Sequence, residues 1–367
     1  MLLIIFLVLF TGVHSDDYLF IMIEQPSLLL PSERMMTTPI LHYTHLMFYQ
    51  IFKDNLIFYD LLKILYILLS YLMINKFFSL FLNKLNSMVV AFLFIFFPTH
   101  DATSFWFIGQ YLLLTISFYL YSYYLCIRNR YYSALIFATL ASFVSYGSTP
   151  IAIGLTFLFI LNKEYKKSLV ILVPNIIYII YYIILTKVLN IGTLRLHDSD
   201  TFNIIKQYVF QIGTFIDSSI GISFFLKLYY SILENNLLTF TIGIVLTIVY
   251  YFNYKPNKDK LDLKLLLSFL LILFVAFGIF SLTGMYPQIA FNLGNRVTIF
   301  GALLMALLIV VFLMNNKKIA TLIFSILIFS ILGVSEHWKA WNKTQLEIIE
   351  NIANNNEIKK FDKTKQL

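Results

Sequence analysis

The chain has 367 residues, of which 59% are hydrophobic and 13% are charged, whereas soluble domains are about 45–50% apolar and about 25% charged. This composition excludes an ordinary soluble domain and predicts an all-α, polytopic integral membrane protein. The net charge of +8 comes mostly from basic residues in short loops, so we expect membrane lipids, and no nucleic acid, as partners.

The first hydrophobic run covers residues 2–13. It has no basic residues before it and no small-residue cleavage site after it, so it is not typical of a signal peptide. A helix of this length reaches only about 20 Å, which is short of the roughly 30 Å hydrocarbon core. It is either a short, shielded first helix or the end of a helix that starts upstream, and we favour the second interpretation.

Residues 14–56 are too polar to span a bilayer, since they contain acids, histidines and three prolines before an amphipathic stretch at 40–52. They predict an outer loop with short interfacial helices. Spanning segments are then expected at about 57–82, 87–98, 104–126, 132–147, 149–161, 168–188, 236–254, 264–283, 297–314 and 319–333. With the first run, these segments make about eleven transmembrane helices.

The basic loops give the orientation. Lysines and arginines gather near residues 128, 165, 258 and 317, and the positive-inside rule makes that side cytoplasmic. The first loop and residues 285–296 then face outward, which we expect to be the outside of a bacterial cytoplasmic membrane.

The same pattern predicts how the chain is divided. Residues 1–333 are predicted to form one membrane-embedded domain, and 334–367 an amphipathic extracytoplasmic tail. Within the outer segment 189–235, the apolar stretch 205–232 is either interfacial or a re-entrant hairpin. Counting it as one spanning helix would put the basic residues near 258 on the outside.

An acidic pair, Asp16 and Asp17, stands at the predicted membrane boundary directly after the first run. A carboxylate there can remove a proton from a hydroxyl group or hold a cation. The second carboxylate can raise the pKa of the first by like-charge repulsion. An interfacial site facing outward would act on lipid-linked substrates, because nucleotide-activated sugars are not expected outside the cytoplasmic membrane.

Asp16-Asp17-Tyr18, followed by a loop with amphipathic helices and a second helix from about residue 57, resembles the GT-C class of integral-membrane glycosyltransferases. The similarity is to the bacterial O-antigen glucosyl-transferase-like and mannosyl-transferase-like members. It implies a polyprenyl-phosphate-sugar donor and inversion at the anomeric carbon. Asp17 is then the preferred general base, with Asp16 beside it.

The resemblance also implies groups that bind the donor phosphate. Members often carry an arginine next to a proline later in the first loop, but here Pro39 follows two threonines, so Arg34 is the candidate substitute. Asn295-Arg296 resembles an Asn-Arg element at the start of a late helix. Arg296 suits phosphate because its planar fork can donate two parallel hydrogen bonds. The alternative role for Arg296 is an interface anchor.

Further polar and aromatic residues are candidates for binding substrate: His100, Asp101, Trp106 and Trp338. Asp101 has the alternative role of a helix N-cap. Glu336, His337, Trp338 and Trp341 form either a sugar-stacking shelf or an interfacial anchor. A divalent cation, Mg²⁺ or Mn²⁺, is a possible cofactor, with Asp16 and Asp101 as its possible ligands.

Two other groups are expected to have ordinary roles. Lys63 lies one or two turns inside the second helix and is expected to extend toward the membrane surface. His42 and His45 are expected on the wet face of an amphipathic helix, because no acidic partner stands at a fixed spacing to complete a metal site.

The leading interpretation is therefore an inverting glycosyltransferase that moves a sugar from a polyprenyl phosphate to an extracytoplasmic glycan, lipid or protein. An O-antigen or capsule polymerase is the main alternative, but such proteins usually carry an arginine-rich later outer loop, and 189–235 holds only Arg195. A flippase or transporter would place ionisable residues near helix midpoints and show repeated halves, and this sequence does neither.

Overall fold

The computed structural model describes residues 1–21, 35–191, 200–255, 260–284, 286–313 and 315–355. In these ranges the chain is helical and contains no strand. In chain order the helices are α1 (Leu2–Val8), α2 (Asp16–Ile21), η2 (Met35–Thr37), α3 (Pro39–Phe52), α4 (Leu56–Phe78), α5 (Lys84–Ile95), η3 (Pro98–His100), α6 (Ala102–Phe105), α7 (Gln110–Ile127), α8 (Tyr131–Val144), α9 (Ser148–Leu161), α10 (Tyr165–Ile183), η4 (Ile184–Val188), α11 (Thr201–Ile220), α12 (Ile222–Leu233), α13 (Leu237–Asn253), α14 (Leu263–Thr283), η5 (Leu293–Thr298), α15 (Ile299–Leu308), η6 (Ile309–Leu313) and α16 (Lys317–Asn354).

Six helical stretches among the described residues are long and apolar enough to cross a membrane: Leu56–Phe78, Tyr165–Val188, Thr201–Leu233, Leu263–Thr283, Leu293–Leu313 and Lys317–Ile352. Four shorter apolar helices accompany them, at α5, α8, α9 and α13. The chain is thus an all-helical protein of the polytopic membrane class. The count of eleven spans stays a prediction.

Several helices stop before they are long enough to span. Helix α5 begins at an N-cap, Asn83, whose side chain accepts hydrogen bonds from the N–H groups of Leu85 and Asn86, and it ends after 12 residues. The 3₁₀ turn η3 then starts at Pro98, which has no N–H to continue the helix. Helices α8 and α9 break similarly at residues 145–147. These breaks bring irregular backbone inside the bundle, where polar groups can face a cavity.

The core is built mainly on α4, α5, α7, α14 and α15, whose facing side chains are fully buried. Phe77 and Phe78 of α4 pack against Phe269 of α14, and Tyr123 of α7 stacks on Phe159 of α9 with ring centroids 4.2 Å apart. Aromatic contacts of this kind add to area burial. They fix the bundle on which the loops rest.

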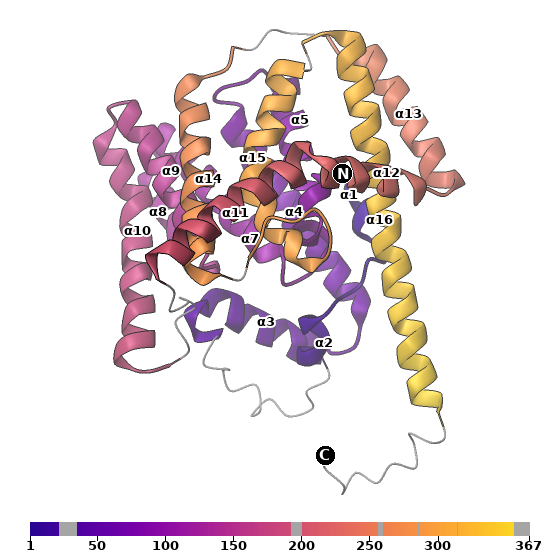
Figure 1. Cartoon of the computed structure of the whole chain (residues 1–367), viewed down its shortest axis with the longest axis horizontal. Coiled ribbons are helices and arrows are strands. Elements are labelled where there is room, and N and C mark those ends of the chain that lie inside the picture. Colours follow the sequence, from indigo (N-terminus) through magenta and orange to yellow (C-terminus); the bar gives the residue numbers. More distant parts are fainter. Residues whose placement is uncertain (22–34, 192–199, 256–259, 285, 314, 356–367) are drawn as a thin grey trace, which may run out of the picture.

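Helices α11 and α12 lie across the direction of α14 and α15 (Figure 1). Gly221 separates them, so the predicted outer segment 205–232 is two helices and not one. A Cβ at Gly221 would lie 2.6 Å from the Cα of Asp217. The backbone therefore turns where only glycine fits.

The structure differs from the predicted boundary at residue 333, because α16 runs without interruption through it. A Cβ at Gly333 would lie 1.6 Å from the carbonyl oxygen of Ser231, so the glycine allows α16 to touch α12. Beyond it, Ser335 Oγ donates a hydrogen bond to the Leu7 carbonyl at 2.6 Å. The part of α16 from Ser335 to Asn342 therefore packs on residues 6–10.

Helix α14 marks the two ends of the bundle. Near its start, Lys264 Nζ donates a hydrogen bond to Asn162 Oδ1 at 2.8 Å, which brings two basic loops together. Near its end, Phe280 lines a cavity with Asp16 and Arg296. A helix of 21 residues is about 30 Å long, close to the thickness of a hydrocarbon core. The basic loops and the acidic loop therefore lie at opposite ends.

This arrangement predicts opposite accessibility for two exposed asparagines, Asn55 before α4 and Asn129 after α7. In a Cys126→Ala background, Asn55→Cys should react with an impermeant thiol reagent added to intact cells, whereas Asn129→Cys should react only after the cells are opened. The native Cys126 is buried, so its removal leaves a clean background. Labelling of both cysteines from outside would contradict the topology.

Candidate functional site

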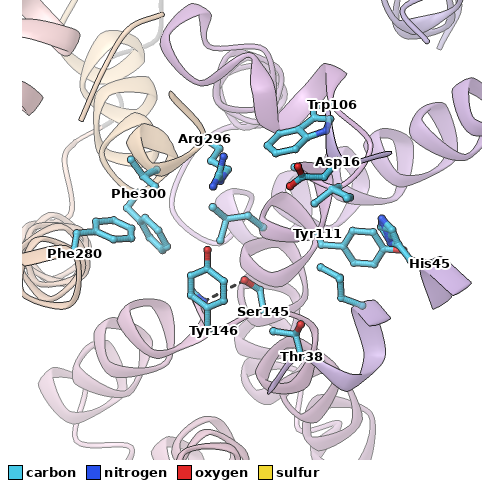
Figure 2. Close-up of a pocket in the computed structure, with 16 residues that line it drawn as sticks. Asp16, Thr38, His45, Trp106, Tyr111, Ser145, Tyr146, Phe280, Arg296 and Phe300 are labelled. Atoms are coloured by element: carbon cyan, nitrogen blue, oxygen red, sulfur yellow. Dashed lines mark hydrogen bonds between the residues drawn. The ribbon is translucent and has the colours of Figure 1, made fainter. Parts of the chain in front are cut away.

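Asp16 is an exposed residue of α2 that lines a cavity of about 300 Å³. We call this space the Asp16 cavity. Figure 2 shows the Asp16 carboxylate and the Arg296 guanidinium pointing into it, with Trp106 beside both. The remaining lining includes Thr38, His45, Tyr111, Ser145, Tyr146, Phe280 and Phe300. A carboxylate and a guanidinium that are 280 positions apart in the sequence thus share one small cavity.

Arg296 is held by aromatic rings and not by acids. Its guanidinium carbon lies 5.2 Å from the Trp106 ring centroid and 5.8 Å from that of Tyr286. Nη1 donates to the Leu293 carbonyl at 3.2 Å. No described carboxylate lies within ion-pair distance of Arg296. Cation–π contacts orient the guanidinium and leave most of its N–H donors available to an anion.

Asp17 has the opposite environment. It is fully buried, and it accepts hydrogen bonds from the His14 N–H at 3.1 Å and from the Tyr49 hydroxyl at 3.1 Å. Burial raises the pKa of Asp17 to about 7, although these donors partly oppose the rise. Asp17 does not line the Asp16 cavity. Of the acidic pair, only Asp16 is exposed and lines this cavity, whereas the preferred base Asp17 is enclosed; the choice of base stays a prediction.

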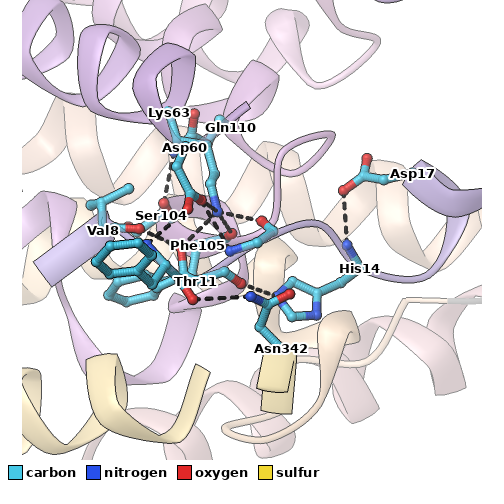
Figure 3. A network of polar contacts seen from close by, with 12 residues as sticks. Val8, Thr11, His14, Asp17, Asp60, Lys63, Ser104, Phe105, Gln110 and Asn342 are labelled. Carbon is cyan, nitrogen blue, oxygen red and sulfur yellow. Dashed lines mark hydrogen bonds and ion pairs between the residues drawn. The ribbon is translucent and has the colours of Figure 1, made fainter. Parts of the chain in front are cut away.

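A buried ion pair holds the loop that carries both aspartates (Figure 3). Asp60 of α4 accepts hydrogen bonds from the backbone N–H groups of Phe10 at 2.7 Å and Gly12 at 3.0 Å. Lys63, one turn later, lies 2.8 Å from the Asp60 carboxylate. Lys63 is fully buried, so the expectation that it extends to the membrane surface was wrong. Its partners lie inside the bundle.

The same lysine reaches two other segments. Lys63 Nζ donates to Thr11 Oγ1 at 2.6 Å and to the Phe105 carbonyl at 3.1 Å. From α16, Asn342 Nδ2 donates to the Phe10 carbonyl at 3.1 Å. Gly12 adopts φ +67°, and a Cβ there would lie 1.9 Å from Asn342 Oδ1. Helices α4, α6 and α16 therefore fix the loop before α2 in one conformation.

His42 and His45 of α3 are both buried, so they do not form the wet face that we expected. The His45 ring lies 4.8 Å from the Phe107 ring and 4.5 Å from the Tyr111 ring, by centroids. Burial lowers the pKa of His45 to about 3. The face of α3 that carries the two histidines thus packs against the protein, where Phe107 and Tyr111 cover it.

Asp101 is bound by three donors. Lys227 Nζ lies 3.2 Å from it, Trp338 Nε1 donates to it at 2.8 Å, and the Asn295 amide also donates to it. Asp101 does stand at the N-cap position of α6, as the alternative role predicted, but its side chain makes no cap hydrogen bond and bonds to these three donors instead. Asn295 Oδ1 accepts from the Ala102 N–H at 3.2 Å, which fixes the segment before Arg296 against α6.

His100 is also occupied. Its Nδ1 lies 2.6 Å from Thr103 Oγ1, and its Nε2 lies 2.6 Å from the Phe94 carbonyl. Both ring nitrogens are thus bonded inside a fully buried site. The turn at η3 directs His100 into the core, away from both cavities, so nothing in the described structure supports the predicted contact with substrate.

The two tryptophans line different spaces. Trp106 lines the Asp16 cavity, and its Nε1 donates to the His14 carbonyl at 2.8 Å. Trp338 lines a second cavity together with Asp101. Asp16 and Asp101 therefore do not converge on one metal ion, and the described residues contain no cluster of three acidic, histidine or cysteine ligands. Arg34 lies outside the described residues.

Comparison with known proteins finds no family model that matches the chain, and no curated protein or solved structure that is significantly similar to it.

Sequence reasoning missed Asp60 and Tyr286. A signal for Asp60 was present, because an acid and a lysine three residues apart in an apolar helix can pair on one face. No signal marked Tyr286, whose role depends on how the segment before α15 folds back over Arg296.

We expect Lys63→Met to destabilise the protein strongly. Removing one partner of a buried ion pair typically costs about 3–5 kcal/mol, because the other charge stays buried. The thermal unfolding midpoint of the purified protein in detergent should fall well below that of wild type. Lys76→Met, at an exposed position of the same helix, is the matched control. Equal midpoints for the two variants would show that the ion pair does not hold the fold.

Asp17 should give stability a specific pH dependence. Because its folded pKa lies near 7 and its ordinary value is 3.8, the folded state keeps a proton that the unfolded chain loses across this window. Stability from this group therefore falls as pH rises through the window. Asp17→Asn removes the effect, so its unfolding midpoint relative to wild type should rise between about pH 4 and 7, the window set by the two pKa values.

The buried His14 and His45 have lowered pKa values, which act in the opposite direction. They are present in both proteins and cancel in the difference. Asp16→Asn is the control for loss of a carboxylate at an exposed position of the same helix. A flat difference for Asp17→Asn would contradict the assignment.

Proposed function

We propose that this chain is an inverting glycosyltransferase that uses a polyprenyl-phosphate-linked sugar as donor. The observation that carries the proposal is the placement of Asp16 and Arg296 on one cavity, with aromatic rings beside them. A transfer from a lipid phosphate needs one group to take a proton and another to stabilise the departing phosphate. These two side chains have the required chemistry.

Asp16 is the general base in this proposal. The acceptor hydroxyl gives its proton to the carboxylate, and its oxygen attacks the anomeric carbon. The bond between that carbon and the phosphate oxygen breaks, and the phosphate leaves with the electron pair. Attack from the side opposite the phosphate inverts the anomeric carbon. The exposure of Asp16 supports this role, because a substrate hydroxyl can reach it.

Arg296 binds the phosphate as it leaves. Its guanidinium keeps donors free, since among the described residues it contacts two aromatic rings and one carbonyl. A planar fork can donate two parallel hydrogen bonds to a phosphate. The ring contacts hold the guanidinium in place before substrate arrives, so little orientation is lost in the transition state.

The membrane setting supports a lipid-linked donor. The Asp16 cavity lies at the end of α14 away from the basic loops, which is the outer side under the positive-inside rule. We therefore place the reaction at the outer face of a bacterial cytoplasmic membrane, in a protein of about eleven spans. The acceptor is an extracytoplasmic glycan, lipid or protein. No step here requires the divalent cation.

Purified protein assayed with a panel of polyprenyl phosphate sugars tests this proposal. Asp16→Asn should lower transfer by about 10²–10⁴-fold, the usual contribution of a general base. Arg296→Lys keeps the charge but loses the fork, so transfer should fall about tenfold or more. Both variants should keep the wild-type unfolding midpoint.

Matched controls are Asp54→Asn and Arg130→Lys, which change the same residue types at exposed positions outside the cavity. They should transfer sugar at the wild-type rate. Wild-type transfer by Asp16→Asn would remove the base from the mechanism, and wild-type transfer by Arg296→Lys would return the arginine to an anchoring role.

A further inference from the structure

A second cavity, of about 890 Å³, lies on the other side of the segment that carries Arg296. We call it the Trp341 cavity. Asn292, Leu293 and Gly294 line this space, whereas Arg296 and Val297 line the Asp16 cavity. Its other walls come from α12 and from the part of α16 beyond Gly333. Its volume is within the range of small-molecule sites.

The charges at the deep end of the Trp341 cavity are already balanced. Lys227 is paired with Asp101, and the Asp101 carboxylate also accepts from Trp338 and Asn295. The Lys227 ammonium lies 5.3 Å from the Phe291 ring. An anionic ligand would have to take Lys227 away from a buried carboxylate, which would leave that charge unpaired and is costly. This end therefore favours a neutral ligand.

The rim adds an accessible acid. Glu234, which directly follows α12, and His337 of α16 lie 3.8 Å apart, and their side chains are 48% and 56% exposed. Glu234 thus keeps a wet carboxylate at the mouth of the cavity, where it can accept hydrogen bonds from hydroxyl groups. Its negative charge further disfavours an anion.

The α16 wall presents indole rings. Trp338 and Trp341 have centroids 5.3 Å apart. The His14 ring packs 4.7 Å from each of them, so the pair is held rigidly by the loop before α2. Trp341 is partly exposed to the cavity. A rigid amphipathic ring next to a carboxylate matches a sugar, which has apolar C–H faces and hydroxyl edges.

We propose that the Trp341 cavity binds a neutral glycan chain, which is the acceptor of the transfer. The role as acceptor site rests on the proposed function, whereas the binding of a glycan does not. The chain lies against Trp341 with hydroxyl groups on Glu234. The body of the glycan lies on one side of segment 292–297, and its acceptor end extends past this segment to bring a hydroxyl group to Asp16. The tail residues of α16 thereby become substrate-binding residues.

Tryptophan fluorescence can test the binding directly. The chain has three tryptophans, and Trp106→Phe leaves only the two that line the Trp341 cavity. The full-length variant, in detergent, is titrated with linear neutral trisaccharides of glucose, mannose, galactose and N-acetylglucosamine. We expect saturable quenching by at least one of them, with a dissociation constant in the millimolar range or below.

Glu234→Gln in the same background should weaken that binding about tenfold, because a hydrogen bond to a charged group is lost. Glu347→Gln, on the exposed side of α16 outside the cavity, should bind as the parent does. Absence of saturable quenching by every trisaccharide overturns the proposal. Equal binding by Glu234→Gln and Glu347→Gln also overturns it, as does saturable quenching by inorganic phosphate alone.

The transfer assay separates this proposal from the proposed function. With Trp106 intact, Glu234→Gln should raise the KM for a glycan acceptor about tenfold while kcat at saturating acceptor stays near wild type. Saturable trisaccharide binding in a protein that transfers no sugar would keep the glycan site and overturn the transferase. Transfer with an unchanged acceptor KM in Glu234→Gln would keep the transferase and overturn this site.

Discussion

The buried pair of Asp60 and Lys63 is the interaction on which the site depends. Removing two charges from water is costly, and the cost is offset only when the remaining donors and acceptors find partners. Here those partners are backbone groups of residues 10–12, Thr11 Oγ1 and the Phe105 carbonyl. The charges inside α4 therefore require the first loop to adopt one path. This path places α2 at the cavity. The buried Asp60–Lys63 pair inside the bundle therefore fixes the position of Asp16 at the end of the bundle.

The two neighbouring aspartates show how this fixed path divides their roles. Successive residues of a helix point about 100° apart, so Asp16 and Asp17 of α2 cannot face the same space. Asp17 turns to Tyr49 and the His14 N–H and joins α2 to α3. Asp16 then faces outward, toward Arg296 (Figure 2). The buried aspartate orients the helix, and the exposed aspartate is left for a substrate.

The helices were predictable because apolar runs and basic loops are local signals. Every range predicted to span contains a helix. The chain leaves the helix after residue 95, just before Pro98, as the proline predicted. The candidate residues were found in part: Asp16, Arg296 and Trp106 do share a cavity. The roles of Asp101 and Asp17 were not predictable, since Asp101 takes its partners from positions 194 and 237 residues away. Burial of Lys63 and His45 likewise depends on segments that only the folded chain brings together.

Segment 292–297 on the other side of the site is also held in one conformation by buried polar contacts. Asn295 bonds to Asp101 and to the Ala102 N–H, so the segment is fixed from α6. This places Arg296 between Trp106 and Tyr286 in one cavity and Asn292 to Gly294 in the other. On one face a cation lacks a described carboxylate partner, and on the other face every deep charge is paired. An unbalanced cation suits a ligand that brings negative charge, and a balanced, aromatic space suits a neutral one. The two faces of one short segment therefore differ in charge balance, and this difference follows from the single fold of residues 292–297.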